Sequence, residues 1–282
     1  MYNARVRKIG ISVITPDGSL RNSHLESQLE LVSKKVYTND FIFRGVDGRA
    51  GSFKEFEFIN QRANSIILGR ELLATEAACL VSHKLAYASS SSDWLVVLED
   101  DAQICSVPAF ETLLVSLAGL KEFSRPTILL LFVGKNGVFS RRSSFEIAKI
   151  NFYKVFKIPT TTCAYVINKE AMELAVRDSD FIGTADWPTW SKEVDFYLTT
   201  SSIVSHEGRE NSIVSQSTAG FGKVWPKFQY SPGANLKELV KGSIPSQVGG
   251  RHAYWRIFTR PLLFWSLSRL PILNFFFSRI NV

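Results

Sequence analysis

The sequence predicts an α/β sandwich with a mainly parallel central sheet. Apolar runs of strand length alternate along the chain with segments of helical periodicity, as in folds that place helices on both faces of a sheet. Residues 94–98, 128–133 and 164–167 are continuously apolar, which is typical of central strands covered on both faces. A chain of 282 residues can bury such a core without disulfides.

The N-terminal elements each have a local pattern. Residues 9–14 form a β-branched run that predicts the first strand, and residues 41–43 predict a second. Residues 23–33 carry apolar side chains at spacings of four and three, which predicts a helix between these strands. A turn follows the second strand at residues 45–48.

The middle of the chain continues the alternation. Residues 71–88 predict a helix that is apolar on two faces and is therefore enclosed by protein. Residues 134–149 are polar, basic and glycine-containing, which predicts an insertion or a mobile loop. Residues 169–176 predict a helix after the third buried strand.

The net charge of +7 belongs to the end of the chain. No acidic residue follows Glu238, whereas six basic residues do, so the rest of the chain is nearly neutral. A nucleic-acid groove needs phosphate-neutralising side chains on the body of the fold. We therefore expect no nucleic-acid partner.

Residues 250–282 interleave arginines with tryptophan and phenylalanine, and Pro261 and Pro271 divide them into short pieces. This composition suits a segment lying on an anionic membrane surface. The alternative is that the aromatic side chains pack onto the main domain or a second subunit. We expect a main domain at residues 1–240 and a basic aromatic tail at residues 241–282.

The cysteines Cys79, Cys105 and Cys163 are odd in number and form no CxxC pattern. They are expected to be free thiols in a reducing compartment rather than disulfides or zinc ligands. The N-terminus lacks the apolar stretch of a signal peptide, and no window is long enough for a spanning helix. We expect a cytoplasmic protein, peripheral on the inner face of the cytoplasmic membrane.

Glu99, Asp100 and Asp101 directly follow the apolar run at residues 94–98. Ligands of open α/β sheets bind outside the carboxyl ends of the strands. In an extended backbone Glu99 and Asp101 point to one side, where they repel unless a cation neutralises them, and carboxylate oxygens suit Mg²⁺ or Mn²⁺. Such an ion would hold a diphosphate leaving group. The alternative is an acidic turn that only caps the strand or the next helix.

Five stretches carry a family resemblance. In chain order they are residues 11–21, 45–48 (GVDG), 73–83 (LATEAACLVSH), 94–101 (WLVVLEDD) and 161–167 (TTCAYVI). Together they resemble glycosyltransferase family 25, the lipooligosaccharide galactosyl- and glucosyltransferases, over residues 9–215. Cys163 stands where the family usually has a small residue or His.

The resemblance implies a GT-A-like fold, with a Rossmann-type nucleotide-sugar half at residues 1–125 and an acceptor half at residues 126–240. It implies an inverting enzyme that uses Mn²⁺ or Mg²⁺ to move a hexose, galactose or glucose, from a UDP-sugar to a glycan acceptor. That acceptor would be a lipid-linked bacterial surface glycan such as lipopolysaccharide, lipooligosaccharide, O-antigen or capsule. A catalytically silent assembly subunit and a metal-dependent phosphoryl-transfer enzyme remain as alternatives, although no P-loop supports the latter.

The resemblance also implies roles for individual residues. Asp101 would bind the metal directly. Glu99 would face the metal, a metal-bound water or the ribose, and Asp100 belongs to the same donor motif. Asp47 and Arg21 would lie near the nucleotide.

Two histidines and a glutamate are further candidates. His206 follows a strand-like segment, and the resemblance to GT-A enzymes implies that it would complete the metal site, the alternative being a solvated loop histidine. His83 is expected to bond a neighbour and shape the donor site from below. Glu76 lies on the same helix and is the expected partner of His83.

An inverting transfer needs a base for the acceptor hydroxyl. Asp186 is the first candidate, with the adjacent Trp187 as an aromatic platform for a sugar ring, and Asp195 is the second. The alternative is that Asp186 is a helix N-cap with Pro188 in the first turn.

Overall fold

The computed structural model describes residues 8–16, 23–32, 42–68, 70–120, 123–132, 138–159, 162–179, 181–201, 203–206 and 277–279. These residues form a nine-stranded sheet, a two-stranded sheet, five α-helices and two short 3₁₀ helices. In chain order the elements are β1 Ile9–Thr15, α1 Ser23–Leu31, β2 Ile42–Arg44, η1 Lys54–Phe58, α2 Gln61–Leu68, α3 Ala74–Ser89, β3 Trp94–Glu99, β4 Ala102–Ile104, α4 Val107–Ala118, β5 Thr127–Leu130, β6 Val138–Ile147, β7 Ile150–Lys157, β8 Ala164–Asn168, α5 Lys169–Arg177, η2 Thr189–Glu193, β9 Asp195–Thr199, β10 Val204–His206 and β11 Phe277–Arg279.

The large sheet has the order β11-β6-β7-β9-β5-β8-β3-β1-β2 and is mixed. Only β1–β2, β1–β3 and β5–β9 pair in parallel, and the other neighbours are antiparallel. The prediction of a mainly parallel sheet is therefore wrong, although the α/β class is confirmed. The physical reason lies in β8, which is buried along its whole length but runs antiparallel to both β3 and β5. A continuous apolar run reports burial on both faces, not strand direction.

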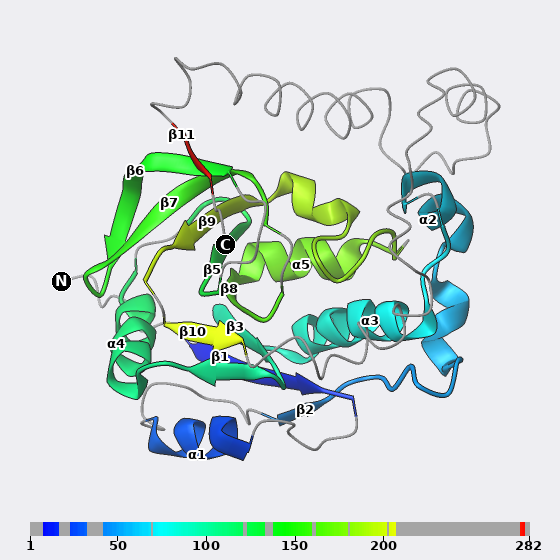
Figure 1. Ribbon diagram of the computed structural model, residues 1–282, viewed down its shortest axis with the longest axis horizontal. Helices are drawn as coiled ribbons and strands as arrows, with labels where there is room; N and C mark the ends of the chain where they lie inside the picture. Colours follow the sequence, from blue (N-terminus) through cyan, green and yellow to red (C-terminus); the bar gives the residue numbers. More distant parts are fainter. Residues whose placement is uncertain are drawn as a thin grey trace.

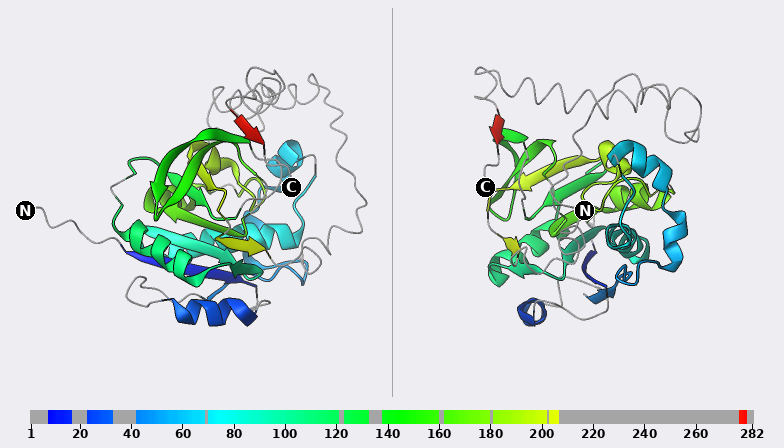
Figure 2. Two further views of the ribbon diagram at one scale, coloured as in Figure 1. Left: turned by 60° about the vertical axis from the view of Figure 1, so that its left-hand side comes forward. Right: turned by 45° about the vertical axis from the view of Figure 1, so that its right-hand side comes forward.

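Helices cover both faces of the sheet, as Figures 1 and 2 show. Trp94, Val96 and Leu98 of β3 pack in one core cluster with α1 and α4. Leu95 and Val97, which point the other way, pack with α3 and α5. All five side chains are at most 1% exposed, and each buried side chain of this size contributes roughly 1.5–3 kcal/mol.

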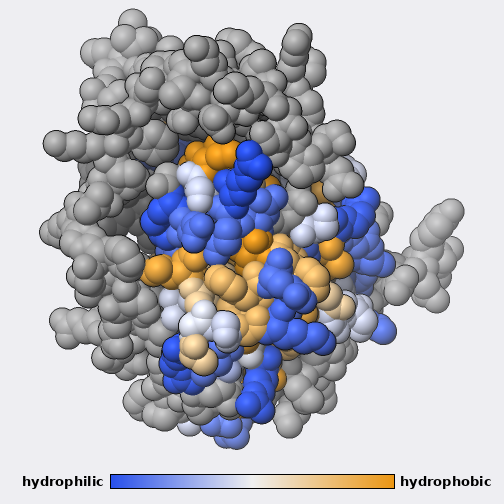
Figure 3. Space-filling view, turned by 90° about the vertical axis from the view of Figure 1, so that its right-hand side faces the viewer, coloured by the Kyte–Doolittle hydropathy of each residue, from blue (hydrophilic) through white to orange (hydrophobic). Residues whose placement is uncertain are grey.

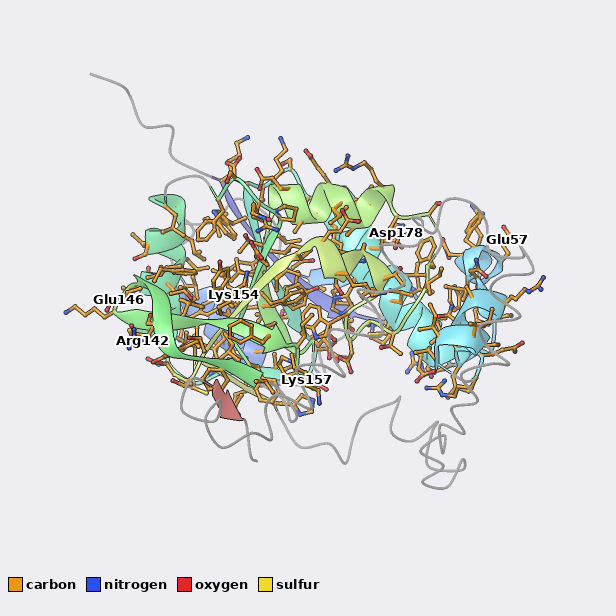
Figure 4. The ribbon with its side chains drawn as sticks, turned by 90° about the horizontal axis from the view of Figure 1, so that it is seen from above. Glu57, Arg142, Glu146, Lys154, Lys157 and Asp178 are labelled. Atoms are coloured by element: carbon orange, nitrogen blue, oxygen red, sulfur yellow. The ribbon has the colours of Figure 1, made fainter. Side chains whose placement is uncertain are left out.

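The segment expected to be a loop at residues 134–149 instead supplies β6, which pairs with β7 as a hairpin. That expectation is wrong over residues 138–147. The turn lies at Ala148 and Lys149, which both have positive φ, whereas turns of this kind usually carry Asn-Gly at these two positions. Figure 4 shows Arg142 and Glu146 on this hairpin at one end of the molecule, which explains the polar composition.

The predicted helix at residues 71–88 is confirmed as α3. It begins at Ala74 because the Glu76 carboxylate accepts a hydrogen bond from the Leu73 N–H at 3.0 Å. Its residues contribute to two different core clusters, so the prediction of an enclosed helix is also confirmed.

Figure 3 shows an apolar area among hydrophilic residues on the side of the molecule that carries α2 in Figure 1.

The tail at residues 241–282 falls almost entirely outside the described residues. Its described part is β11, which pairs antiparallel with β6 at the sheet edge. No helix among the described residues is long and apolar enough to cross a membrane.

Candidate active site

A cavity of about 110 Å³ opens at the carboxyl ends of the parallel strands β1, β2 and β3. Helix α3 forms its floor with Thr75, Ala78, Cys79 and Ser82, and the acidic triplet closes it at the end of β3. The lining residues are Ile14, Pro16, Val46, Asp47, Gly48, Arg49, Thr75, Ala78, Cys79, Ser82, Glu99, Asp100 and Asp101. A cavity therefore exists at the carboxyl ends of the strands, where the sequence predicts a ligand site.

The GVDG segment packs directly on α3. The N–H of Val46 donates to the Ser82 hydroxyl at 2.8 Å, and a Cβ on Gly45 would lie 2.6 Å from that same oxygen. A Cβ on Gly48 would lie 2.4 Å from the carbonyl oxygen of Ala74, which is backbone and cannot move aside. Both glycines are needed because the loop lies against the helix with no room for a side chain.

This close packing presents Asp47 at the cavity. Its carboxylate binds the Arg49 guanidinium, with an Oδ2 to Nη2 distance of 2.6 Å. Asp47 therefore lines the same cavity as the acidic triplet. Arg21, the other residue expected near the nucleotide, lies outside the described residues.

Glu99 ends a hydrogen-bonded chain that runs through the core. The hydroxyls of Tyr87 and Tyr165 bond each other, and the Tyr165 hydroxyl lies 2.7 Å from His83 Nδ1. His83 Nε2 lies 3.3 Å from Glu99 Oε1, which also accepts from the Thr162 hydroxyl at 2.5 Å. If Tyr87 donates to Tyr165 and Tyr165 to His83, the remaining ring proton of neutral His83 points at Glu99.

This chain keeps Glu99 ionised. Burial by itself would raise the pKa of Glu99, but the hydrogen bond from His83 and the contact with Thr162 hold that pKa below its ordinary value. Burial raises the pKa of Tyr165 far above its usual range, so this hydroxyl stays protonated. His83 is thus bonded to its neighbours Tyr165 and Glu99, and its role in shaping the donor site stays a prediction.

Glu76 is not the partner of His83, and that expectation is wrong. Its two carboxylate oxygens each accept from the Arg70 guanidinium at 2.6 Å, and it caps α3 through Leu73. Glu76 does not line the cavity. A glutamate in the first turn of a helix is held by the unpaired N–H groups there, which explains its position.

Asp101 and His206 meet beyond the end of β3. His206 Nε2 lies 3.2 Å from Asp101 Oδ2, because β10 pairs with β4 and sets His206 opposite Ala102. The Phe132 ring stacks on His206 at 5.8 Å and orients it. Asp100, next to Asp101, is 2% exposed and faces the cavity.

The start of β8 completes this cluster. The N–H of Glu99 donates to the Cys163 carbonyl at 2.9 Å, so the antiparallel ladder places Thr162 and Cys163 beside the triplet. Cys163 Sγ, an Asp101 oxygen and a His206 nitrogen all lie within 4.8 Å of one another. Burial and the charge of Glu99 raise the pKa of the Cys163 thiol.

Asp186 lies across Thr162 from the triplet, with its Oδ1 3.5 Å from the Thr162 hydroxyl. The Asp186 side chain is exposed to solvent but is surrounded by protein on its other sides. The resulting partial desolvation, together with the charge of Glu99, raises the pKa of Asp186 to about 6. The alternative helix-cap role is wrong, because η2 begins at Thr189 with Pro188 as its N-cap.

Comparison with known proteins identifies the chain. The model of glycosyltransferase family 25 (LPS biosynthesis protein) matches residues 17–185, which is more than half of the sequence. The chain belongs to this family. It is therefore a glycosyltransferase, and the family description links it to LPS biosynthesis. No curated protein matches it.

The family 25 match contains the GVDG segment, α3 and the acidic triplet but ends one residue before Asp186. Asp186, Asp195 and His206 thus lie outside the residues that the family model matches. Two of the three, Asp186 and His206, lie with the triplet.

Asp195 lies apart from the other candidates of this glycosyltransferase. It starts β9 opposite Thr127, at the edge of the sheet where β3 begins rather than ends. Its carboxylate binds Lys154 and lies 3.3 Å from Arg125. Figure 4 labels Lys154 on β7, on the side away from α3. These ion pairs give Asp195 a structural role at that edge.

Trp187 supports the loop of Asp186 from within. Its indole N–H donates to the Pro159 carbonyl at 2.8 Å, and its ring packs edge-to-face on Tyr165 and Phe196. Its φ of 81° is unusual for a non-glycine residue and shows how tightly these contacts hold the loop. The ring thus packs around Asp186 and is half-buried, and its use as a platform for a sugar stays a prediction.

Proposed function

We propose that this family 25 enzyme is an inverting, metal-dependent transferase with a GT-A fold. It moves a hexose, galactose or glucose, from a UDP-sugar to a surface glycan under construction. The supporting observation is that Asp101 and His206 meet beside a cavity at the ends of three parallel strands, with Asp186 nearby. In this proposal residues 1–125 form the nucleotide-sugar half and residues 126–240 the acceptor half.

The residues around Asp101 fit a divalent cation. A carboxylate and an imidazole are ligands that Mn²⁺ accepts, and Glu99 and Asp100 add negative charge beside them. Asp101 and His206 would hold the ion, and Glu99 would face the ribose or a water on the metal. When bound, the ion would neutralise the diphosphate as UDP leaves.

Asp186 is proposed as the base. The acceptor oxygen gives its proton to Asp186 while it bonds the anomeric carbon of the sugar, and the bond from that carbon to the diphosphate breaks. A pKa of about 6 leaves Asp186 ionised at neutral pH yet more basic than an ordinary aspartate. Thr162 has one hydroxyl proton, which Glu99 accepts at the shorter distance, so its oxygen can accept from Asp186 once Asp186 is protonated.

The deciding experiment screens UDP-, GDP- and CMP-sugars for Mn²⁺-dependent binding and slow hydrolysis. Wild type should bind one UDP-hexose in a metal-dependent manner, and Asp101→Asn should lose this dependence. Asp186→Asn should keep donor binding and lose transfer, whereas Asp195→Asn should keep both. Metal-dependent phosphodiester cleavage without sugar transfer would favour the phosphoryl-transfer alternative, and absence of metal-dependent donor binding would refute the proposal.

We also propose that the acceptor is lipid-linked and that the tail holds the enzyme at the cytoplasmic face of an anionic membrane. Support comes from the arginines and aromatic residues of 250–282. Truncation after residue 250 should release the protein from anionic liposomes while donor binding persists. Equal liposome binding by the truncated chain would contradict this.

A further inference from the structure

Cys163 stands beside the two residues proposed to hold the cation. Its Sγ lies within 4.8 Å of the Asp101 and His206 ligand atoms, and the residue is 1% exposed. The bond from the Glu99 N–H to its carbonyl fixes the backbone at this point. Three different ligand types therefore converge from three segments of the chain: a turn, the start of β8 and the end of β10.

We propose that Cys163 supplies a sulfur ligand to the cation of this site, so that the site prefers thiophilic divalent ions over Mg²⁺. The inference rests on the proposed function in one respect, the assignment of Asp101 and His206 as ligands. A soft sulfur ligand favours ions such as Zn²⁺, Co²⁺ and Cd²⁺, whereas Mg²⁺ takes oxygen ligands. Mn²⁺ lies between these classes in its tolerance of sulfur.

The spacing of the three cysteines predicts no metal ligand, because spacing patterns such as CxxC reveal only sites that are built mainly from cysteines. Here the partners are a carboxylate and an imidazole, which the sheet brings together from distant positions. The simpler role for Cys163 is packing, since it also belongs to the apolar core cluster. The two roles differ in whether sulfur touches a bound metal.

A second group of ligand types, Cys79, His83 and Glu99, lies nearby and provides the matched control. Both ring nitrogens of His83 are already engaged there, one with Tyr165 and one with Glu99. That group holds its histidine within the hydrogen-bonded chain and offers no free ring nitrogen to a metal. Cys79 is therefore a suitable control. Its thiol lies close to the same carboxylates, but the proposal does not make it a metal ligand.

The first test uses Co²⁺ as the probe. Full-length protein loaded with Co²⁺ should show a near-ultraviolet thiolate-to-cobalt charge-transfer band. The band should vanish in Cys163→Ser and Cys163→Ala and persist in Cys79→Ser and in Cys105→Ser, whose thiol is exposed. Cd²⁺ affinity should fall roughly tenfold or more in Cys163→Ser, with a smaller loss for Mg²⁺. A band that survives in Cys163→Ser, or that is lost in Cys79→Ser, overturns the proposal.

X-ray absorption of the Zn²⁺-loaded wild type gives an answer that needs no variant to fold. It should show one sulfur at about 2.3 Å together with oxygen or nitrogen ligands. Zinc bound through oxygen and nitrogen alone overturns the sulfur ligand, whereas Mn²⁺-dependent UDP-sugar binding in the same preparation would leave the proposed function standing. Loss of both would refute the metal site altogether.

Discussion

Replacing Tyr165 with phenylalanine tests the chain that ends at Glu99. The hydroxyl is fully buried and bonds both His83 and Tyr87, so its removal leaves two buried polar groups without this partner. Each such group costs about 1–3 kcal/mol, so Tyr165→Phe should lower the free energy of unfolding by roughly 2–6 kcal/mol. His83 then loses the contact that sets its ring proton, and metal-dependent binding of the donor should weaken as well.

Tyr87→Phe is the matched control, because it removes only the far end of the chain. Tyr165 can still donate to His83, so the loss should be about 1 kcal/mol and donor affinity should hold. In the Tyr165→Phe background, however, Tyr87→Phe removes a stranded hydroxyl and should restore about 1 kcal/mol. Urea unfolding of the four proteins measures this cycle. Additive losses, or equal damage to donor binding by both single variants, would refute the ordered chain.

Three further outcomes follow from the site. In metal-free buffer the pKa of Asp186 is raised to about 6 from its ordinary 3.8, so its ionisation lowers the stability of the folded protein as pH rises. In denaturant titrations Asp186→Asn should therefore gain stability relative to wild type as the pH rises from 4 to 7. A stability difference that stays constant over this range would contradict the raised pKa. Transfer by wild type should rise with pH through the range in which Asp186 ionises and then level off, whereas a flat profile would point to another base. Gly48→Ala would place a Cβ against the backbone of Ala74, so it should lower the free energy of unfolding by about 1–3 kcal/mol and weaken donor binding. The control Gly119→Ala, whose Cβ would lie 3.6 Å from its nearest atom, should have neither effect. Equal effects of the two variants would show that the loop at Gly48 adapts.

Much of the fold could be predicted because burial leaves a direct trace in the sequence. The runs that became β3, β5 and β8 are apolar because both faces are covered, and α3 is apolar on two sides for the same reason. The hairpin of β6 and β7 left no such trace. Its exposed polar residues and a turn built from Ala148 and Lys149 instead of glycine or asparagine made it read as a loop.

The candidate site divides in a similar way. The acidic triplet could be predicted as a strand-end site because it directly follows a buried apolar run, whereas Asp47 and His206 were proposed from the resemblance. Their functional assignment depended on the resemblance to family 25, because an acidic turn after a strand does not by itself indicate one function. Glu76 was assigned the wrong partner because a place on the same helix does not decide which group a side chain binds, and Arg70 binds Glu76.

Thr162 and Cys163 show what the sequence could not supply. They precede a buried strand, and in a parallel sheet the start of a strand lies at the edge opposite the triplet. Only the antiparallel direction of β8 brings them to Glu99, and no apolar run reports that direction. The same reversal links the two halves of the site, because Thr162 contacts Glu99 on one side and Asp186 on the other. Three parallel strands thus form the cavity proposed for the donor, and one reversed strand couples it to the proposed base.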